Sequence, residues 1–229
     1  MEQLPNGYTL SLCAGAFPLS TDSMLLAHFV RLPRNAAVLD LGSGCGTLGL
    51  LLCAKDPGCT VTGVELDIRA HEEALDNARR NHLARLTCIH GDLRRISETL
   101  APGSFDCCVS NPPYFSGGPA SQATPLARRE DCCTPGDLMG AAARCIKYGG
   151  DFFLVHKPER LAELIAKAAP HHLEAKRLQL IRHRENGPIS LILLQFRKGG
   201  KPGLIWEEQY LFDSNGEPSP FYKQVYHLT

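Results

Sequence analysis

The feature that most constrains this chain is a short apolar strand that runs directly into three closely spaced glycines. Residues 37–41 read Ala-Val-Leu-Asp-Leu, and Gly42, Gly44 and Gly46 follow at alternate positions. Glycine adopts positive φ readily, and its lack of a Cβ lets the backbone pass close to a ligand. A buried strand that ends in such a turn is typical of an open α/β sheet, which binds its ligand at the carboxyl ends of the strands.

Strand-like runs alternate with helical patterns along most of the chain. Helices are predicted over residues 24–30, 68–83, 138–146 and 158–169, where apolar residues recur at helical spacing or a proline marks a helix start. Predicted strands lie at residues 37–41, 59–65, 86–90, 105–110, 150–156, 173–183 and 188–196. Arg-Glu-Asn-Gly joins the last two, so they should form an antiparallel hairpin. The alternation predicts an α/β fold with a seven-stranded, mostly parallel sheet closed by a C-terminal antiparallel hairpin.

The chain of 229 residues has the length of one domain with a small extension. We expect a single domain over residues 1–198. Prolines and glycines are frequent in residues 199–229, which predicts a loop-rich extension packed on or near that domain. Residues 116–135 also lack a helical pattern, and a loop of that length in a domain is usually functional or disordered.

The charges balance, with 24 Lys plus Arg against 24 Asp plus Glu. This excludes a uniformly basic nucleic-acid-binding protein but allows a local patch, and basic groups occur at 128–129, 176–177, 182–184 and 197–201. The ten cysteines form no Cys-x-x-Cys pair, so free thiols are favoured over a metal site or disulfides. The start lacks a signal pattern and no apolar run approaches the length of a membrane span, so we expect a cytoplasmic protein.

Carboxylates lie at or near the carboxyl ends of the first three predicted strands of the sheet. Glu65 ends the second strand, where it can accept from both hydroxyls of a ribose, and Asp92 follows the third, where it can accept from an adenine amine. Asp40 lies in the first strand. The glycine spacing lacks the third glycine of a dinucleotide turn, which favours S-adenosylmethionine as the cofactor. A dinucleotide site and a purely structural turn remain open, and Asp92 could also cap the next helix.

The fourth predicted strand ends in Asn111-Pro112-Pro113-Tyr114. The two prolines fix the backbone and remove two N–H donors. The Asn111 side-chain oxygen and the Pro112 carbonyl are then two acceptors that can hold the hydrogens of a planar exocyclic amine. Tyr114 can stack on the ring that bears the amine. An ordinary turn at the end of a strand is the alternative interpretation.

These motifs together resemble the class I S-adenosylmethionine-dependent methyltransferases of the N6-adenine type. Within that class the chain most resembles the tRNA1(Val) adenine-37 N6-methyltransferase family, over residues 18–196. The similar segments are Leu-Asp-Leu-Gly-Ser-Gly-Cys-Gly, Gly-Val-Glu, Gly-Asp, Asn-Pro-Pro-Tyr-Phe and, before the first strand, Thr-Asp-x-x-Leu-Leu. The resemblance implies a Rossmann-like fold, S-adenosylmethionine as cofactor and RNA as partner, with tRNA as the expected kind of RNA.

The resemblance also assigns further site residues. Thr21 and Asp22 are expected to close over the cofactor, unless they only form a capping box for the helix at 24–30. Asn111 is expected to contact the cofactor as well as the substrate. Phe115, Arg128 and Arg129, in and near the loop after the tetrapeptide, are expected to bind the substrate.

The expected activity is transfer of a methyl group to the exocyclic amine of an adenine in RNA, with adenine 37 of tRNA(Val) as the target. Other planar amines suit the same tetrapeptide, so guanine N2 in ribosomal RNA and the side chain of a protein glutamine are alternatives. A non-catalytic module that binds cofactor or RNA is a third.

Overall fold

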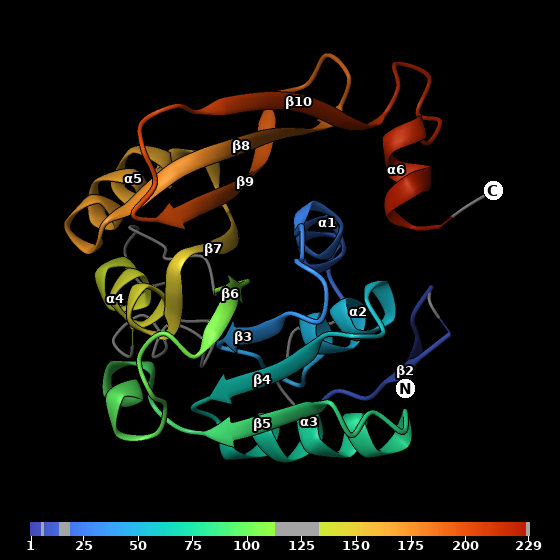
Figure 1. Ribbon diagram of the computed structural model, residues 1–229. Coiled ribbons are helices and arrows are strands. Elements are labelled where there is room, and N and C mark those ends of the chain that lie inside the picture. Colours follow the sequence, from blue (N-terminus) through green and yellow to red (C-terminus); the bar gives the residue numbers. More distant parts are fainter. Residues whose placement is uncertain (6, 14–18, 113–132, 228–229) are drawn as a thin grey trace, which may run out of the picture.

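The computed structural model describes residues 1–5, 7–13, 19–112 and 133–227. Within these residues, eight strands form one mixed sheet in the order β10-β8-β9-β7-β6-β3-β4-β5, and β1 and β2 form a separate short pair (Figure 1). The strands are β1 (Glu2–Gln3), β2 (Thr9–Leu10), β3 (Ala37–Leu41), β4 (Thr60–Glu65), β5 (Leu86–His90), β6 (Phe105–Ser110), β7 (Ile146–His156), β8 (Leu173–Arg184), β9 (Ile189–Lys198) and β10 (Ile205–Phe212).

Helices cover both faces of this sheet. They are α1 (Thr21–Phe29), α2 (Thr47–Lys55), α3 (Ile68–Arg80), α4 (Pro135–Cys145), α5 (Leu161–Ala168) and α6 (Pro220–Val225), with the short 3₁₀ helices η1 (Leu93–Glu98), η3 (Pro158–Arg160) and η4 (Ala169–His171). In the described part of the chain, none of them is both long and apolar enough to cross a membrane.

Strand periodicity explains the two hydrophobic cores. In β7, Phe153 and Val155 point into the core shared with α1, α2 and α6, whereas Phe152 and Leu154 point into the core shared with α4 and α5. Successive side chains of a strand point to opposite faces of a sheet. Residues 152–155 of β7 are apolar at every position, so this part of the strand must be covered on both sides. Figure 1 shows this arrangement, with α4 and α5 on one side of the central strands and α1 and α2 on the other.

The strand order creates a switch point at the carboxyl end of β3. From β3 the chain passes to β4 and then β5 on one side, and β6 pairs in parallel with β3 on the other side. Two neighbouring loops therefore diverge where β3 ends, which is where open α/β sheets bind their ligands. The strand-end residues singled out from the sequence all lie at this edge.

The α/β fold with a mostly parallel sheet and an antiparallel hairpin is confirmed by the topology. The extension at 199–229 also contains regular structure, because β10 and α6 lie within it, and β10 pairs in parallel with β8 as an eighth strand of the sheet. The expected count of seven strands was therefore one too low. The domain boundary at residue 198 stays a prediction.

A buried asparagine on α3 ties the N-terminal segment to the glycine turn. Asn77 is fully buried, its Nδ2 donates to the carbonyl oxygens of Ser11 (2.8 Å) and Cys45 (2.9 Å), and its Oδ1 accepts from the Ser11 amide (2.9 Å). One side chain thus satisfies three backbone groups from two segments that are distant in the sequence.

We predict that Asn77→Ala lowers the free energy of unfolding by about 2–4 kcal/mol, because it leaves buried backbone groups without hydrogen-bond partners. Urea denaturation followed by circular dichroism measures the change. The matched control is Asp76→Ala, one position away on the same helix, where only exposed ion pairs are lost and a change below about 0.5 kcal/mol is expected. Equal losses for the two variants would contradict the anchoring role of Asn77.

Candidate functional site

The glycine turn after β3 adopts a backbone that other residues reach only with strain. Gly42 and Gly44 have φ of +74° and +55°, and a Cβ built on either would find no protein atom within 4 Å. The amides of Gly42 and Ser43 both donate to the Val64 carbonyl, at 2.9 and 3.2 Å. These hydrogen bonds hold the turn against β4. The open space beside Gly42 and Gly44 can admit a ligand close to the backbone.

Glu65, at the end of β4, organises this turn. Its side chain is 9% exposed; Oε2 accepts from the Gly44 amide and Oε1 from the Asp67 amide, each at 2.8 Å. Each carboxylate oxygen keeps a second lone pair after these bonds. The predicted contact of Glu65 with ribose hydroxyls stays a prediction, and Glu65 also has a structural role that the sequence did not indicate.

Asp40 is the most unusual ionisable group of the site. It is 1% exposed, and neither carboxyl oxygen has a hydrogen-bond partner among the described residues. Burial, followed by the negative charge of Glu65, raises the pKa of Asp40 to about 8. A buried carboxyl without a donor is costly unless a ligand supplies one. Asp40 and Glu65 therefore fit a cofactor that carries positive charge and N–H donors, as S-adenosylmethionine does.

Asn111 reaches α1 from the carboxyl end of β6. Its Nδ2 donates to Ser23 Oγ over 3.0 Å, and the preceding Ser110 hydroxyl donates to the Leu41 carbonyl over 2.7 Å. These bonds place Asn111 between the end of β3 and the first turn of α1. Because the amide nitrogen is engaged by Ser23, the side-chain oxygen of Asn111 is left as the acceptor for a ligand.

The first turn of α1 holds Thr21 and Asp22, but neither is the helix cap. The N-cap is Ser20, whose side chain accepts from the Ser23 amide, so the helix starts at Thr21 rather than at the expected residue 24. Tyr226 donates from its hydroxyl to Thr21 Oγ1 over 3.1 Å, which brings the segment after α6 to this edge. Burial raises the pKa of Asp22, opposed by the charge of Lys157. Contact of Thr21 and Asp22 with the cofactor stays a prediction.

Asp92 caps η1, as the alternative interpretation held. Its Oδ1 accepts from the Arg94 amide at 2.9 Å, and its Oδ2 pairs with the Arg94 guanidinium at 2.6 Å. This hydrogen-bonded ion pair with Arg94 lowers the pKa of Asp92, which keeps the carboxylate charged. Asp92 follows β5, two strands from β3, and its predicted contact with the adenine amine of the cofactor stays a prediction.

Several predicted residues lie outside the described part of the chain. Pro112 is described and buried. Pro113, Tyr114 and Phe115 of the tetrapeptide motif, and Arg128 and Arg129 of the following loop, fall among residues 113–132, which are not described. Among the described residues, no three His, Cys, Asp or Glu side chains are grouped as a metal site, and the cysteines there are free thiols.

Sequence reasoning missed Ser23 and Tyr226. Ser23 stands three residues after the capping serine of α1, a spacing that indicates a helix start but not which strand the helix start faces. Tyr226 lies in the segment that was expected to be loop-rich.

We predict that Asp40→Asn makes stability less dependent on pH. The pKa of Asp40 in the folded protein, about 8, exceeds its ordinary value of 3.8, so the unfolded chain binds fewer protons between these values. Stability of the wild type should therefore fall as pH rises through this window, by up to about 1.4 kcal/mol per pH unit from this group, and the variant should lose that slope.

Urea denaturation at pH 5, 6, 7 and 8 and constant ionic strength measures the slope. Asp76→Asn, an exposed carboxylate on α3, serves as control and should run parallel to the wild type over this range. A constant difference between Asp40→Asn and the wild type at all four pH values would show that Asp40 is not protonated in the folded protein.

Comparison with known proteins identifies the family to which this fold and site belong. The family model described as methyltransferase small domain matches residues 19–177. A tRNA1(Val) (adenine(37)-N6)-methyltransferase of Dickeya chrysanthemi is 32% identical over 81% of this chain and 75% of its own. A relative of the same name from Yersinia pseudotuberculosis is 31% identical over 92% of this chain and 84% of its own.

A solved structure agrees on the fold. The crystal structure of a predicted O-methyltransferase, Atu636 of Agrobacterium tumefaciens, superposes with a TM-score of 0.75 at 24% identity, covering 90% of this chain and 96% of that one. The expected resemblance and the expected cofactor are confirmed: the chain belongs to the methyltransferase small domain family and is an S-adenosylmethionine-dependent methyltransferase.

Proposed function

We propose that this enzyme methylates the exocyclic amine of an adenine in RNA, and that its target is adenine 37 of tRNA(Val) in the cytoplasm. The observation that carries the proposal is the orientation of Asn111. Its nitrogen is held by Ser23, so its oxygen is presented as an acceptor at the switch point between β3 and β6. Together with the Pro112 carbonyl it makes two acceptors, and two acceptors suit an amine better than a hydroxyl, because an amine offers two N–H donors and a hydroxyl only one.

Asn111 and Pro112 act by positioning. The Asn111 oxygen and the Pro112 carbonyl accept the two hydrogens of the amine, which favours pyramidal geometry at nitrogen and directs its lone pair. When bound, S-adenosylmethionine supplies the electrophilic methyl group. No general base is needed before transfer, because the methylated ammonium loses its proton readily. The rate gain therefore comes from orientation and from acceptors fixed in advance.

The acidic residues of the site hold the cofactor in this proposal. Glu65 accepts from the ribose hydroxyls with its remaining lone pairs, and Asp92 accepts from the adenine amine. Asp40 is buried and has no donor within the described part of the chain, and it receives one from the amino-acid end of the cofactor. Gly42 and Gly44 provide the space, whereas a Cβ on Gly46 would meet the Cβ of Ala74 at 3.3 Å, so Gly46 lets the turn pack closely against α3.

Two lines of support favour tRNA. Relatives at 32% and 31% identity carry the name tRNA1(Val) (adenine(37)-N6)-methyltransferase and align over most of this chain. An unpaired base of a loop is also the cheapest to move out of its stack into a protein site. Adenine 37 lies beside the anticodon and meets that condition.

We predict that Asn111→Ala lowers turnover about 100-fold or more and leaves the affinity for S-adenosylhomocysteine within a few-fold, since the lost contact is to the substrate amine. Ser23→Ala should lower turnover about tenfold, because the Asn111 amide is no longer held, and Ser23→Thr should restore most of it. Steady-state kinetics and calorimetry measure these effects. A large loss of cofactor affinity in Asn111→Ala would contradict the assigned role.

The target itself is tested by mass spectrometry of nucleosides after incubation with tRNA(Val). We expect N6-methyladenosine, and strong loss when adenine 37 is replaced by guanine. N2-methylguanosine would reject the adenine assignment. In a parallel incubation with total RNA and protein, label found only in ribosomal RNA or in protein glutamine would reject adenine 37 of tRNA(Val) as the target. Cofactor binding without methylation of any fraction would favour a non-catalytic module.

A further inference from the structure

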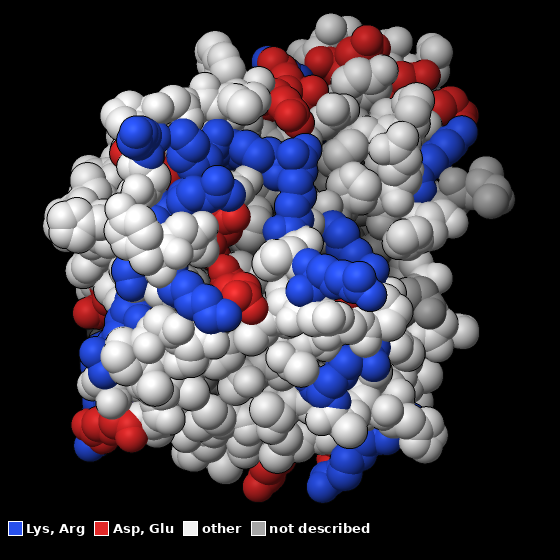
Figure 2. Space-filling model, viewed as in Figure 1, with Lys and Arg blue, Asp and Glu red and all other residues white. Residues whose placement is uncertain are grey.

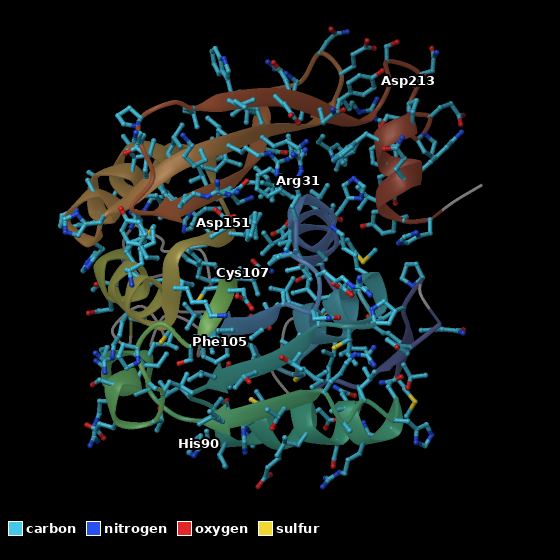
Figure 3. The ribbon with its side chains drawn as sticks, in the orientation of Figure 1. Arg31, His90, Phe105, Cys107, Asp151 and Asp213 are labelled. Atoms are coloured by element: carbon cyan, nitrogen blue, oxygen red, sulfur yellow. The ribbon has the colours of Figure 1, made fainter. Side chains whose placement is uncertain are left out.

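A second candidate site, lined by basic residues, lies at the edge of the sheet opposite Asn111. A cavity of about 620 Å³ opens where β7, β8 and β10 begin and β9 ends, beside the segment that follows α1. Five cations from these elements line it: Arg31, Lys147, Lys176, Arg177 and Arg197. Figure 2 shows Lys and Arg side chains gathered around a hollow that contains a few acidic groups. In Figure 3, Arg31 and Asp151 lie on either side of this region.

The acidic groups of the cavity are already neutralised. Asp106 pairs with Lys147 at 2.6 Å, and Asp151 pairs with Arg197 at 2.8 Å. The other three cations, Arg31, Lys176 and Arg177, form no ion pair within the described residues, although Asp151 and Glu207 act on Arg177 at longer range. The cavity therefore keeps an excess of positive charge in a protein whose net charge is zero.

Arg177 is held in place rather than free in solvent. Its guanidinium lies 4.3 Å from the centroid of the Phe29 ring, and its Nη1 donates to the Phe29 carbonyl and to Gln195 Oε1, each at 3.4 Å. Gln195 is 5% exposed, so one anchor of the guanidinium is itself buried. A cation fixed in this way binds an anion with little loss of side-chain freedom.

Lys55 does not line the cavity but adds positive charge near it. Its Nζ donates to the carbonyl oxygens of Ala27, His28 and Val30 at the end of α1. Burial, followed by the charges of Arg177 and Arg31, lowers the pKa of Lys55 to about 8. Three cations that repel one another are thus held near the cavity by the packing of α1, α2 and β8. An anion bound there would relieve the repulsion.

The cavity also has an apolar and aromatic rim. Tyr148 and Ile205 line it with exposed fractions of 81% and 63%. A flat ring beside a cluster of cations is the combination that binds a base together with its phosphate. A small inorganic anion would use only the cations.

We propose that this cavity binds phosphate groups of a nucleotide ligand, and that the ligand is the backbone of the RNA substrate. The phosphate site stands independently of the proposed function, whereas RNA as its source rests on that function. β6 has six residues, so the two edges of the sheet are about 20 Å apart. A folded tRNA can reach both edges, and a free nucleotide cannot.

The test compares binding of tRNA and of AMP by a double variant, Arg31→Gln with Lys176→Gln, and by the wild type. Fluorescence of the single tryptophan, Trp206, which follows Ile205 and is 72% exposed, reports binding without methyl transfer. The matched control is Arg144→Gln with Lys167→Gln, which removes two exposed cations from α4 and α5.

We expect the double variant to raise the Kd for tRNA about tenfold or more and to flatten its salt dependence, by about 0.7–0.9 in slope per lost contact. The control should change the Kd less than twofold.

Each alternative outcome has a defined meaning. An unchanged Kd and salt slope for tRNA, or an equal loss in the control, would overturn RNA binding at this cavity. Binding of AMP that the double variant abolishes, with tRNA affinity unchanged, would keep the phosphate site but assign it to a free nucleotide. No binding of either probe would overturn the site. Methylation at a different base would reject the proposed function and leave these binding results intact.

Discussion

The candidate site at the carboxyl edge of the sheet depends on the carboxylate of Glu65. It accepts from the amide of Gly44 in the turn after β3 and from that of Asp67 before α3, so it joins the ends of two neighbouring strands. The same negative charge adds to the effect of burial in raising the pKa of Asp40. One buried group thus fixes the shape of the glycine turn and contributes to the protonation state of the carboxyl beside it. Both effects are present before any ligand arrives, which is what preorganisation of a binding site requires.

The fold was largely predictable where strands are buried on both faces. The runs at 37–41 and 105–110 coincide with β3 and β6, because short apolar runs bounded by turn residues leave little ambiguity. The predicted strand at 86–90 coincides with β5, although β5 lies at the edge of the sheet and is only partly buried. Helix α2 was not predicted, because its buried stretch is apolar at nearly every position and shows no polar face. Strand β10 was not predicted either, because it is exposed where α2 is buried. It is an edge strand whose first four residues are exposed, so it shows no alternation of apolar and polar residues.

The candidate site was predictable only where residues occupy strand ends. Asp40, Glu65 and Asn111 were found because the carboxyl ends of parallel strands converge. Ser23 was not, because its contact with Asn111 joins residues 88 positions apart and depends on how α1 packs against the sheet. The basic cavity could not be predicted from the sequence either. Lys176, Arg177 and Arg197 were visible only as scattered charges, and the return of β8 and β9 across the sheet brings them together with Arg31.

The hydrogen bond between Tyr226 and Thr21 has a consequence for how the enzyme becomes active during folding. It joins residues 205 positions apart, so it closes a loop that contains nearly the whole chain. Contacts of such separation carry a large entropic cost of loop closure and slow the folding steps that depend on them. The parallel strands of the core can assemble first, and the first turn of α1 then gains its last partner. We therefore expect the candidate site to be completed after the sheet has folded.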